Sequence, residues 1–189
     1  MTSPRAVVIG ASAGALQALS QILPALPADF PLPILVVVHI PRDRRNRLAP
    51  LFQAKCRMAV REGEDKEPAL PGTIYFAPPD YHLLVERDGT LSLSSDEEVL
   101  FSRPSIDVLF ESAADAFDDA VVGVVLTGAN PDGANGLKAI ADAGGEAIVE
   151  DPAAAYCSAM PLAALARCNT ARVLPLGRIA GYLMETCAA

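Results

Sequence analysis

The hydrophobic positions of this chain fall into short continuous runs that glycine, proline or polar residues interrupt. Residues 6–10, 34–38, 121–126 and 147–149 contain no polar side chain. Apolar runs of this length, without alternation, are typical of strands that are buried on both faces of a parallel sheet. The pattern therefore predicts a sheet whose central strands are covered by helices on both sides.

Helices are predicted between these runs, where apolar residues recur at three- and four-residue spacing. Ser105 is a predicted N-cap, with Asp107 in the first turn of the helix that follows. Strands and helices that alternate in this way predict a three-layer α/β fold with a doubly wound, mostly parallel sheet. The predicted helices cover residues 13–26, 46–54, 105–117, 134–143, 160–166 and 179–186.

One stretch departs from this alternation of strands and helices. Residues 81–86 and 91–93 have the composition of strands, and the turn formers of residues 87–90 separate them. Two strands so close in sequence are typical of an antiparallel hairpin. We therefore predict a hairpin inserted into the parallel scheme, preceded by strands near residues 58–60 and 72–78.

Length and composition fit a single domain, residues 1–189, because 51% hydrophobic residues suffice for one core with two sides. The net charge of −8 argues against binding to nucleic acid or to an anionic membrane surface. Arg42, Arg44, Arg45 and Arg47 form a local basic cluster, which is either solvated or faces an acidic partner. No apolar run reaches the roughly 18 residues that span a bilayer, so no membrane insertion is expected.

Four cysteines and two histidines offer little for a metal site. The cysteines are widely spaced and include no Cys-x-x-Cys pair, and neither histidine lies at a metal-ligand spacing. We therefore predict no metal, no cofactor and no disulfide framework. The lack of a signal segment at the start of the chain, together with free cysteines, predicts a cytoplasmic protein.

The first apolar run leads into Gly10-Ala11-Ser12-Ala13-Gly14, a Gly-x-Ser-x-Gly turn between a predicted strand and a predicted helix. Such a turn can project the serine hydroxyl above the sheet edge and leave backbone N–H groups free around it. It therefore suits either a nucleophile or an anion cradle. A dinucleotide fingerprint is excluded because Ser12 takes the place of the second glycine and His39, not an acidic residue, ends the second run.

Two further polar residues follow predicted strands: His39 comes after residues 34–38, and Asp132 lies in the loop after residues 121–126. The carboxyl ends of parallel strands meet at one edge of a sheet, so Ser12, His39 and Asp132 are expected to gather there. A serine needs a base to take its proton, and the imidazole needs a carboxylate to orient it. We expect Nε2 of His39 to face the Ser12 hydroxyl and Asp132 to contact the other ring nitrogen.

Each of these residues also fits a structural role when it is considered alone. Ser12 can belong to a phosphate-binding turn, His39 can be a hydrogen-bonded residue at a strand end, and Asp132 can be a turn or N-cap residue. Their predicted coincidence at one sheet edge favours the catalytic interpretation. His82, in the predicted hairpin, is expected to be exposed or packed rather than to act as a base.

Five short motifs are spread over nearly the whole chain. They are Ile-Gly-Ala-Ser-Ala-Gly at 9–14, Val-His-Ile-Pro at 38–41, Pro-Asp-Tyr-His-Leu at 79–83, Arg-Pro-Ser-Ile-Asp at 103–107 and Leu-Thr-Gly-x-x-x-Asp-Gly-Ala at 126–134. In this order they resemble the catalytic domain of the chemotaxis receptor methylesterases, the CheB family. The resemblance places the family's nucleophile at Ser12, its base at His39 and its orienting aspartate at Asp132.

This resemblance implies hydrolysis of glutamate γ-methyl esters on the helical signalling domain of methyl-accepting chemotaxis receptors, with release of methanol. Deamidation of particular glutamines is implied as a second activity. The resemblance also implies that the backbone N–H groups of Ala13 and Ala129 face the oxyanion, and that Arg103 and Pro131 belong to the substrate-binding surface.

Three features depart from the family's usual pattern. Ala13 and Ala15 replace a threonine and a glycine of the serine turn, and Ala129-Asn130-Pro131 stands where methionine and glycine are common. No receiver domain precedes the first strand, so we expect no phosphorylation switch within the chain and regulation by a separate protein. Two alternatives stay open, a non-catalytic domain that binds a receptor or signalling partner and an esterase for small molecules.

Overall fold

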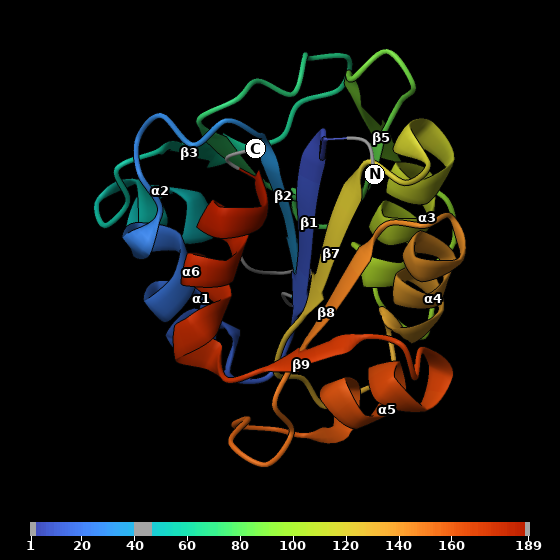
Figure 1. The fold of residues 1–189 in the computed structure, drawn as a ribbon. Coiled ribbons are helices and arrows are strands. Elements are labelled where there is room, and N and C mark those ends of the chain that lie inside the picture. The colour runs from blue at the N-terminus through green and yellow to red at the C-terminus, as the bar shows by residue number, and fades with distance from the viewer. Residues whose placement is uncertain (1–2, 40–46, 188–189) are drawn as a thin grey trace.

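A computed structural model describes residues 3–39 and 47–187. Within these residues, seven parallel strands form one sheet in the order β3-β4-β2-β1-β7-β8-β9 (Figure 1). The chain moves outward from the central strand β1 in both directions, as in a doubly wound fold. The strands are β1 (Ala6–Ala11), β2 (Ile34–Val38), β3 (Ala59–Glu62), β4 (Thr73–Phe76), β7 (Val121–Val125), β8 (Glu146–Glu150) and β9 (Arg172–Leu174).

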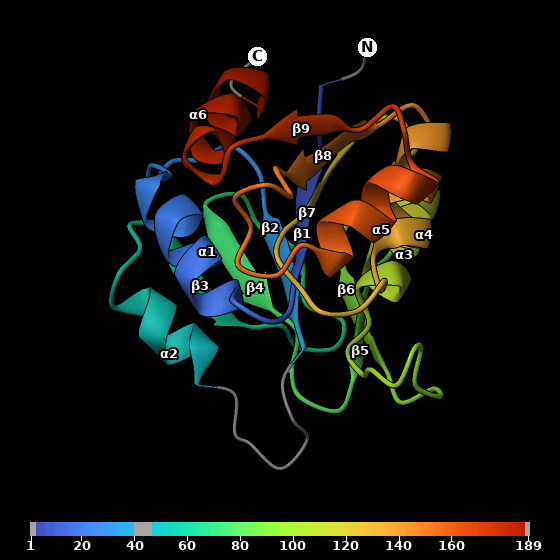
Figure 2. The ribbon, with the colours of Figure 1, turned by 90° about the horizontal axis from the view of Figure 1, so that it is seen from below.

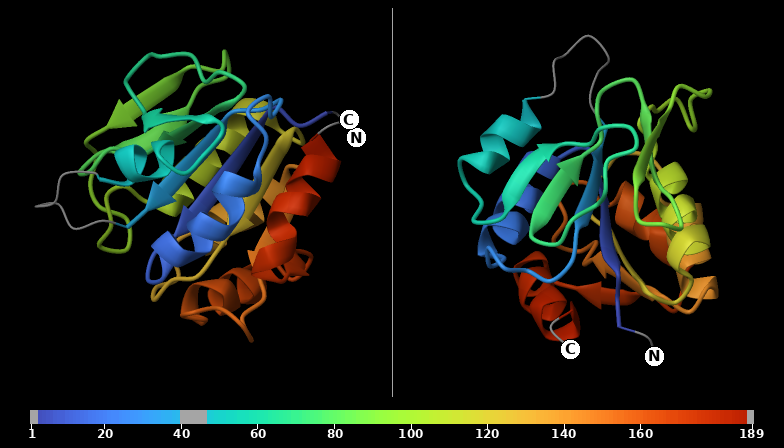
Figure 3. Two further views of the ribbon diagram at one scale, coloured as in Figure 1. Left: turned by 90° about the vertical axis from the view of Figure 1, so that its left-hand side faces the viewer. Right: turned by 90° about the horizontal axis from the view of Figure 1, so that it is seen from above.

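Helices cover both faces of this sheet, which confirms the predicted three-layer α/β fold. The left-hand view of Figure 3 has α1, α2 and α6 in front of the strands, and Figure 1 shows α3 and α4 on the opposite side. Two hydrophobic clusters lie on either side of the sheet, because successive residues of the fully buried strands point to opposite faces. The helices are α1 (Ala15–Ile22), α2 (Leu48–Gln53), α3 (Ile106–Phe117), α4 (Ala134–Asp142), α5 (Ala159–Arg167) and α6 (Leu176–Cys187).

The predicted hairpin is present as β5 (His82–Val85) and β6 (Leu91–Ser94), which pair antiparallel as a separate two-stranded sheet. Leu83, Val85 and Leu91 are buried in the same cluster as α3. The N–H of Val85 also donates to the hydroxyl of Ser112 on α3, at 3.1 Å. The hairpin is therefore attached to the helix rather than to the edge of the main sheet.

The larger differences from the sequence-based prediction concern two helices and one strand. The helix predicted for residues 13–26 ends at Ile22 and continues as a single 3-10 turn, Leu23–Ala25, because Pro24 has no N–H for the helical bonds. Strand β9 was not predicted, since its three residues are short and largely exposed and form no hydrophobic run. Helix α6 begins at Leu176, ahead of the predicted start at residue 179.

The predicted basic cluster is only partly described. Arg42, Arg44 and Arg45 lie outside the described residues, and Arg47 is the residue that precedes α2. Within the described ranges, no helix has the length and hydrophobicity that crossing a membrane requires.

Helices α3 and α4 approach each other closely at Gly136. A Cβ atom at this position would lie 2.5 Å from Cβ of Phe110 and 3.1 Å from the backbone of Asp107. Neither neighbour is the free end of a flexible side chain, so the two helices would have to separate. Gly136 is thus required by packing rather than by backbone conformation.

We expect Gly136→Ala to lower the free energy of unfolding by about 1–3 kcal/mol, because the added methyl group overpacks the α3–α4 contact. Gly181, inside α6, is a matched control, since a Cβ there would meet nothing within 4 Å. Gly181→Ala should raise the free energy of unfolding by about 0.5–1 kcal/mol through helix propensity. Urea unfolding measures both, and a neutral or stabilising Gly136→Ala would contradict the packing argument.

Candidate functional site

The carboxyl ends of β1 and β2 bring Ser12 and His39 next to each other in the sheet. Ala11 and Val38 are paired in the parallel register, and Ser12 and His39 are the residues that follow them. The N–H of His39 donates to the carbonyl of Ala11 at 3.2 Å. The loops at this edge lie at the bottom of Figure 1 and face the viewer in Figure 2.

His39 and Asp132 form a close pair although 93 positions separate them. Nε2 of His39 lies 2.7 Å from Oδ2 of Asp132, and the side chains are 12% and 0% exposed. The expectation that Nε2 faces Ser12 is therefore wrong. Nε2 is the ring nitrogen farther from the backbone, and it reaches the buried carboxylate. The remaining nitrogen, Nδ1, is the one on which His39 can accept a proton.

Asp132 lies at the N-terminus of α3, where further donors surround it. Its Oδ1 accepts hydrogen bonds from the Ser105 hydroxyl and the Asp107 N–H, both at 2.9 Å, and its Oδ2 accepts the Ile106 N–H at 2.7 Å. Burial by itself raises the pKa of Asp132, but the hydrogen bonds from His39, Asp107 and Ile106 outweigh it and hold that pKa below its usual value. Asp132 is therefore ionised and oriented at neutral pH.

Asp107 makes the reciprocal contact with the start of α4. Its Oδ1 accepts the N–H groups of Gly133 and Gly136 at 2.9 and 2.7 Å. Burial, together with the nearby negative charge of Asp132, raises the pKa of Asp107. The sequence alone predicts Asp107 in the first turn of its own helix, but these bonds to α4 depend on how the two helices pack.

Asn130 is a further residue that the sequence analysis did not single out as functional. Its Oδ1 accepts the N–H of Asp132 at 3.1 Å, so its amide nitrogen is the group left to approach His39. Nδ2 of Asn130 lies 3.5 Å from Nδ1 of His39. The sequence Asn-Pro-Asp could have indicated the bond between Asn130 and the Asp132 N–H, because an asparagine side chain commonly hydrogen-bonds the backbone two residues ahead.

Thr127 anchors the serine turn to the loop that follows β7. Its carbonyl accepts the Ser12 N–H at 2.9 Å, and its hydroxyl donates to the Ala13 carbonyl at 2.8 Å. Among the described residues, the N–H groups of Ala13 and Ala129 donate no hydrogen bond to the protein. They are available to a ligand, and their assignment to an oxyanion stays a prediction.

Arg103 is held by the protein itself. Its guanidinium donates to Asp80 at 2.7 Å and to the carbonyls of Ser95 and Asp96 at 2.9 Å. These contacts fix the loop that leads from β6 to α3. Pro131 is exposed beside Asp132. A role of Arg103 and Pro131 in substrate binding stays a prediction.

Two of the four cysteines are unsuited to act as a competing nucleophile. Burial raises the pKa of the Cys56 and Cys187 thiols to about 11, which keeps both protonated at neutral pH. All four cysteines are free. In the part of the chain that the structure describes, no group of three His, Cys, Asp or Glu side chains is placed to hold a metal ion.

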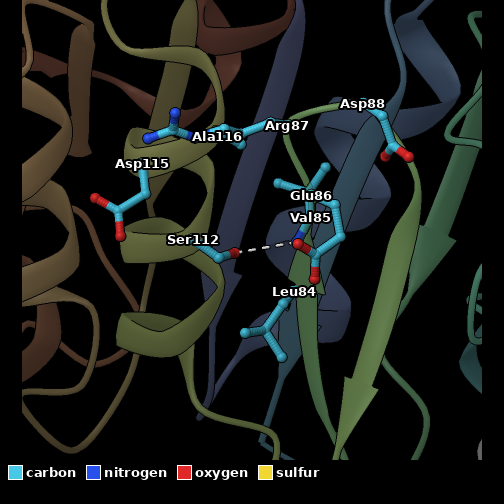
Figure 4. A pocket seen from close by; sticks show the side chains of 8 residues that line it. All are labelled: Leu84, Val85, Glu86, Arg87, Asp88, Ser112, Asp115 and Ala116. Atoms are coloured by element: carbon cyan, nitrogen blue, oxygen red, sulfur yellow. Dashed lines mark hydrogen bonds between the residues drawn. The ribbon is translucent and has the colours of Figure 1, made fainter.

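A hollow of about 600 Å³ lies elsewhere, between the hairpin and the second half of α3 (Figure 4). Glu86, Arg87 and Asp88 line it from the hairpin side, and Ser112 and Asp115 line it from the helix. Asp132 contacts the opposite end of α3. This hollow is therefore separate from the edge that holds His39.

Comparison with known proteins identifies the family of this chain. The chain matches the CheB methylesterase family over residues 7–183. A provisionally named protein-glutamate methylesterase/protein-glutamine glutaminase of Leptospira interrogans is 47% identical over 175 residues, which are 93% of this chain and 91% of that protein. Protein-glutamate methylesterase/protein-glutamine glutaminase 3 of Geobacter metallireducens is 38% identical over 189 residues, 98% of this chain and 53% of that protein.

A solved structure shares the fold. The crystal structure of the Thermotoga maritima CheB methylesterase catalytic domain superposes with a TM-score of 0.92 at 34% identity, and covers 97% of this chain and 99% of that domain. The chain spans nearly all of the Leptospira protein and about half of the Geobacter protein. By its sequence and its fold, this chain belongs to the CheB methylesterase family.

Proposed function

We propose that this chain is a protein-glutamate methylesterase that hydrolyses glutamate γ-methyl esters with Ser12 as nucleophile, His39 as base and Asp132 as the orienting carboxylate. The observation that carries the proposal is the 2.7 Å contact between Nε2 of His39 and Asp132 at the strand end beside the Ser12 turn. Membership of the CheB family and the names of the relatives support the same reaction. The glutaminase part of those names supports glutamine deamidation as a second activity.

In the proposed reaction, the Ser12 hydroxyl attacks the ester carbonyl while Nδ1 of His39 takes its proton. Backbone N–H groups of Ala13 and Ala129 stabilise the oxyanion. Methanol leaves with the proton from His39, and a glutamyl ester of Ser12 remains. His39 then removes a proton from water, which attacks this ester, and the proton returns to the Ser12 oxygen as glutamate is released.

Asp132 stabilises the imidazolium that forms in both steps. Its low pKa means that it stays ionised beside His39 and keeps the proton on Nε2. Asn130 favours the same tautomer of His39. Its amide directs a hydrogen toward Nδ1, which favours an unprotonated Nδ1 in the resting state. This nitrogen is then free to act as the base when substrate displaces the weak 3.5 Å contact.

We propose that the substrate is the signalling domain of a methyl-accepting chemotaxis receptor and that the reaction takes place in the cytoplasm. A protein substrate suits an open sheet edge, since the site lies among exposed loop residues such as Ala129 and Pro131. We further propose that a separate regulatory protein controls the activity. The family and the names of the relatives support the protein substrate.

Ser12→Ala should lower methanol release from methylated receptor by about 10³-fold or more, because no other described group occupies the turn as nucleophile. Ser20→Ala is the matched control, a serine within α1 that should keep native activity. Undiminished turnover by Ser12→Ala would refute the mechanism. Receptor binding without turnover by the native chain would favour the non-catalytic alternative, and activity on soluble esters alone would favour a small-molecule esterase.

Asp132→Asn should reduce kcat by about 10³- to 10⁴-fold by removing the carboxylate that holds His39.

The stability of the native chain should also depend on the charge of Asp132. Because the pKa of Asp132 is lower in the folded than in the unfolded chain, the charged carboxylate stabilises the fold above the unfolded pKa of about 3.9. This stabilisation is lost as the pH falls through the folded pKa. The difference in unfolding free energy between the native chain and Asp132→Asn should therefore shrink as the pH falls below about 4. Urea unfolding at several pH values measures this, and a difference that grows in acid would contradict it.

A further inference from the structure

His82 lies at the first position of β5 and is 1% exposed. Its Nδ1 accepts the N–H of Ser105 at 3.1 Å, and its Nε2 lies 2.9 Å from the carbonyl of Glu97. A backbone N–H can only donate and a carbonyl can only accept. The two partners therefore require a neutral imidazole that carries its hydrogen on Nε2.

Ser105 connects this histidine to the proposed active site. Its N–H donates to His82, and its hydroxyl donates to Oδ1 of Asp132 at 2.9 Å. The other oxygen of Asp132 contacts Nε2 of His39. Three successive hydrogen bonds thus lead from His82 to His39 through one serine and one carboxylate.

We propose that His82 is a positioning residue for catalysis. It holds the backbone of Ser105 so that the serine hydroxyl stays on Asp132 and the carboxylate keeps facing His39. His82 is buried and none of its hydrogen bonds reaches Ser12 or His39, so it acts through Ser105 and not on the substrate. The proposal rests on the proposed function, in which the geometry of Asp132 and His39 sets the rate.

The Ser105 hydroxyl has two partners, so its position depends closely on where the Ser105 backbone is held. As the N-cap of α3, Ser105 also accepts the N–H of Val108 with its hydroxyl oxygen, at 3.4 Å. The same hydroxyl therefore has to serve the helix and Asp132 at once, and small rotations of its backbone would release one of the two. The bond to His82 is the contact of Ser105 that comes from outside α3 and the Asp132 loop.

The test compares two substitutions of His82. Leu removes the acceptor for the Ser105 N–H, whereas Asn retains an acceptor oxygen close to the place of Nδ1. His82→Leu should lower kcat about 10- to 100-fold, since an unpaired buried N–H shifts Ser105, while KM stays within about threefold. His82→Asn should recover most of that loss, which a role in filling space alone would not produce.

Tyr75→Phe provides a matched control in strand β4. The Tyr75 hydroxyl also accepts a backbone N–H, from Leu70 at 3.0 Å, and donates to a carbonyl, that of Pro68 at 3.1 Å. Its side chain is fully buried and has no hydrogen bond to Ser105 or Asp132. We expect Tyr75→Phe to lower the melting temperature in the same way as His82→Leu but to leave kcat unchanged.

A third variant tests whether His82 acts through Ser105 and Asp132. Ser105→Ala removes the hydroxyl on Asp132 and leaves the N–H that His82 binds. If both residues act through the same carboxylate, the losses in kcat of His82→Leu and Ser105→Ala should be less than additive in the double variant. Fully additive losses would overturn the proposal, as would a folded His82→Leu protein with native kcat or a His82→Asn protein no better than His82→Leu.

Nitrogen NMR of the imidazole rings gives a readout that does not need activity. The chain has only two histidines, so two ring systems are expected. His82 of the native chain should show the tautomer with hydrogen on Nε2, and the His39 signals should shift in His82→Leu but not in Tyr75→Phe. Unchanged His39 signals would overturn this proposal, whereas a native chain that releases no methanol would overturn the proposed function instead.

Discussion

The site depends on a buried carboxylate at the start of a helix. Asp132 is fully buried, and removing such a charge from water costs several kcal/mol unless other groups take the place of the solvent. The N–H groups of Ile106 and Asp107 have no partner within α3, and they carry the positive end of its dipole. The helix start therefore replaces water around Asp132, keeps it charged and points one oxygen at His39.

This arrangement is reciprocal, because each of the two neighbouring helices receives a carboxylate from the other's chain segment. Asp132 precedes α4 and binds the start of α3, whereas Asp107 belongs to α3 and binds the N–H groups of Gly133 and Gly136 at the start of α4. Gly133 adopts φ +98°, a left-handed conformation that favours glycine, as the chain enters α4. The position of Asp132 over the sheet edge therefore depends on how α3 and α4 pack, in addition to the bond that Asn130 makes within its own loop.

The sequence was sufficient to predict what depends on periodicity and strand order. Continuous apolar runs indicated buried parallel strands, and the rule that ligands bind at their carboxyl ends brought His39 and Asp132 to one edge. The prediction that Nε2 of His39 faces Ser12 was wrong. Which ring nitrogen meets Asp132 depends on how deeply the carboxylate is buried, and the sequence does not show that depth. The sequence predicted His82 as an exposed or packed residue and assigned Asn130 no contact with His39. The hydrogen-bond partners of both residues are fixed only by tertiary packing.

The serine turn departs from the family's usual sequence, yet the bonds that place it do not involve the altered side chains. Thr127 accepts the Ser12 N–H with its carbonyl and donates its hydroxyl to the Ala13 carbonyl. Its own N–H is held by the buried carboxylate of Glu150 at 2.8 Å. The turn is thus anchored through main-chain groups and through one threonine in the loop that follows β7. Because alanine at position 13 offers the same N–H and carbonyl as threonine, the backbone groups that a nucleophile turn requires are retained.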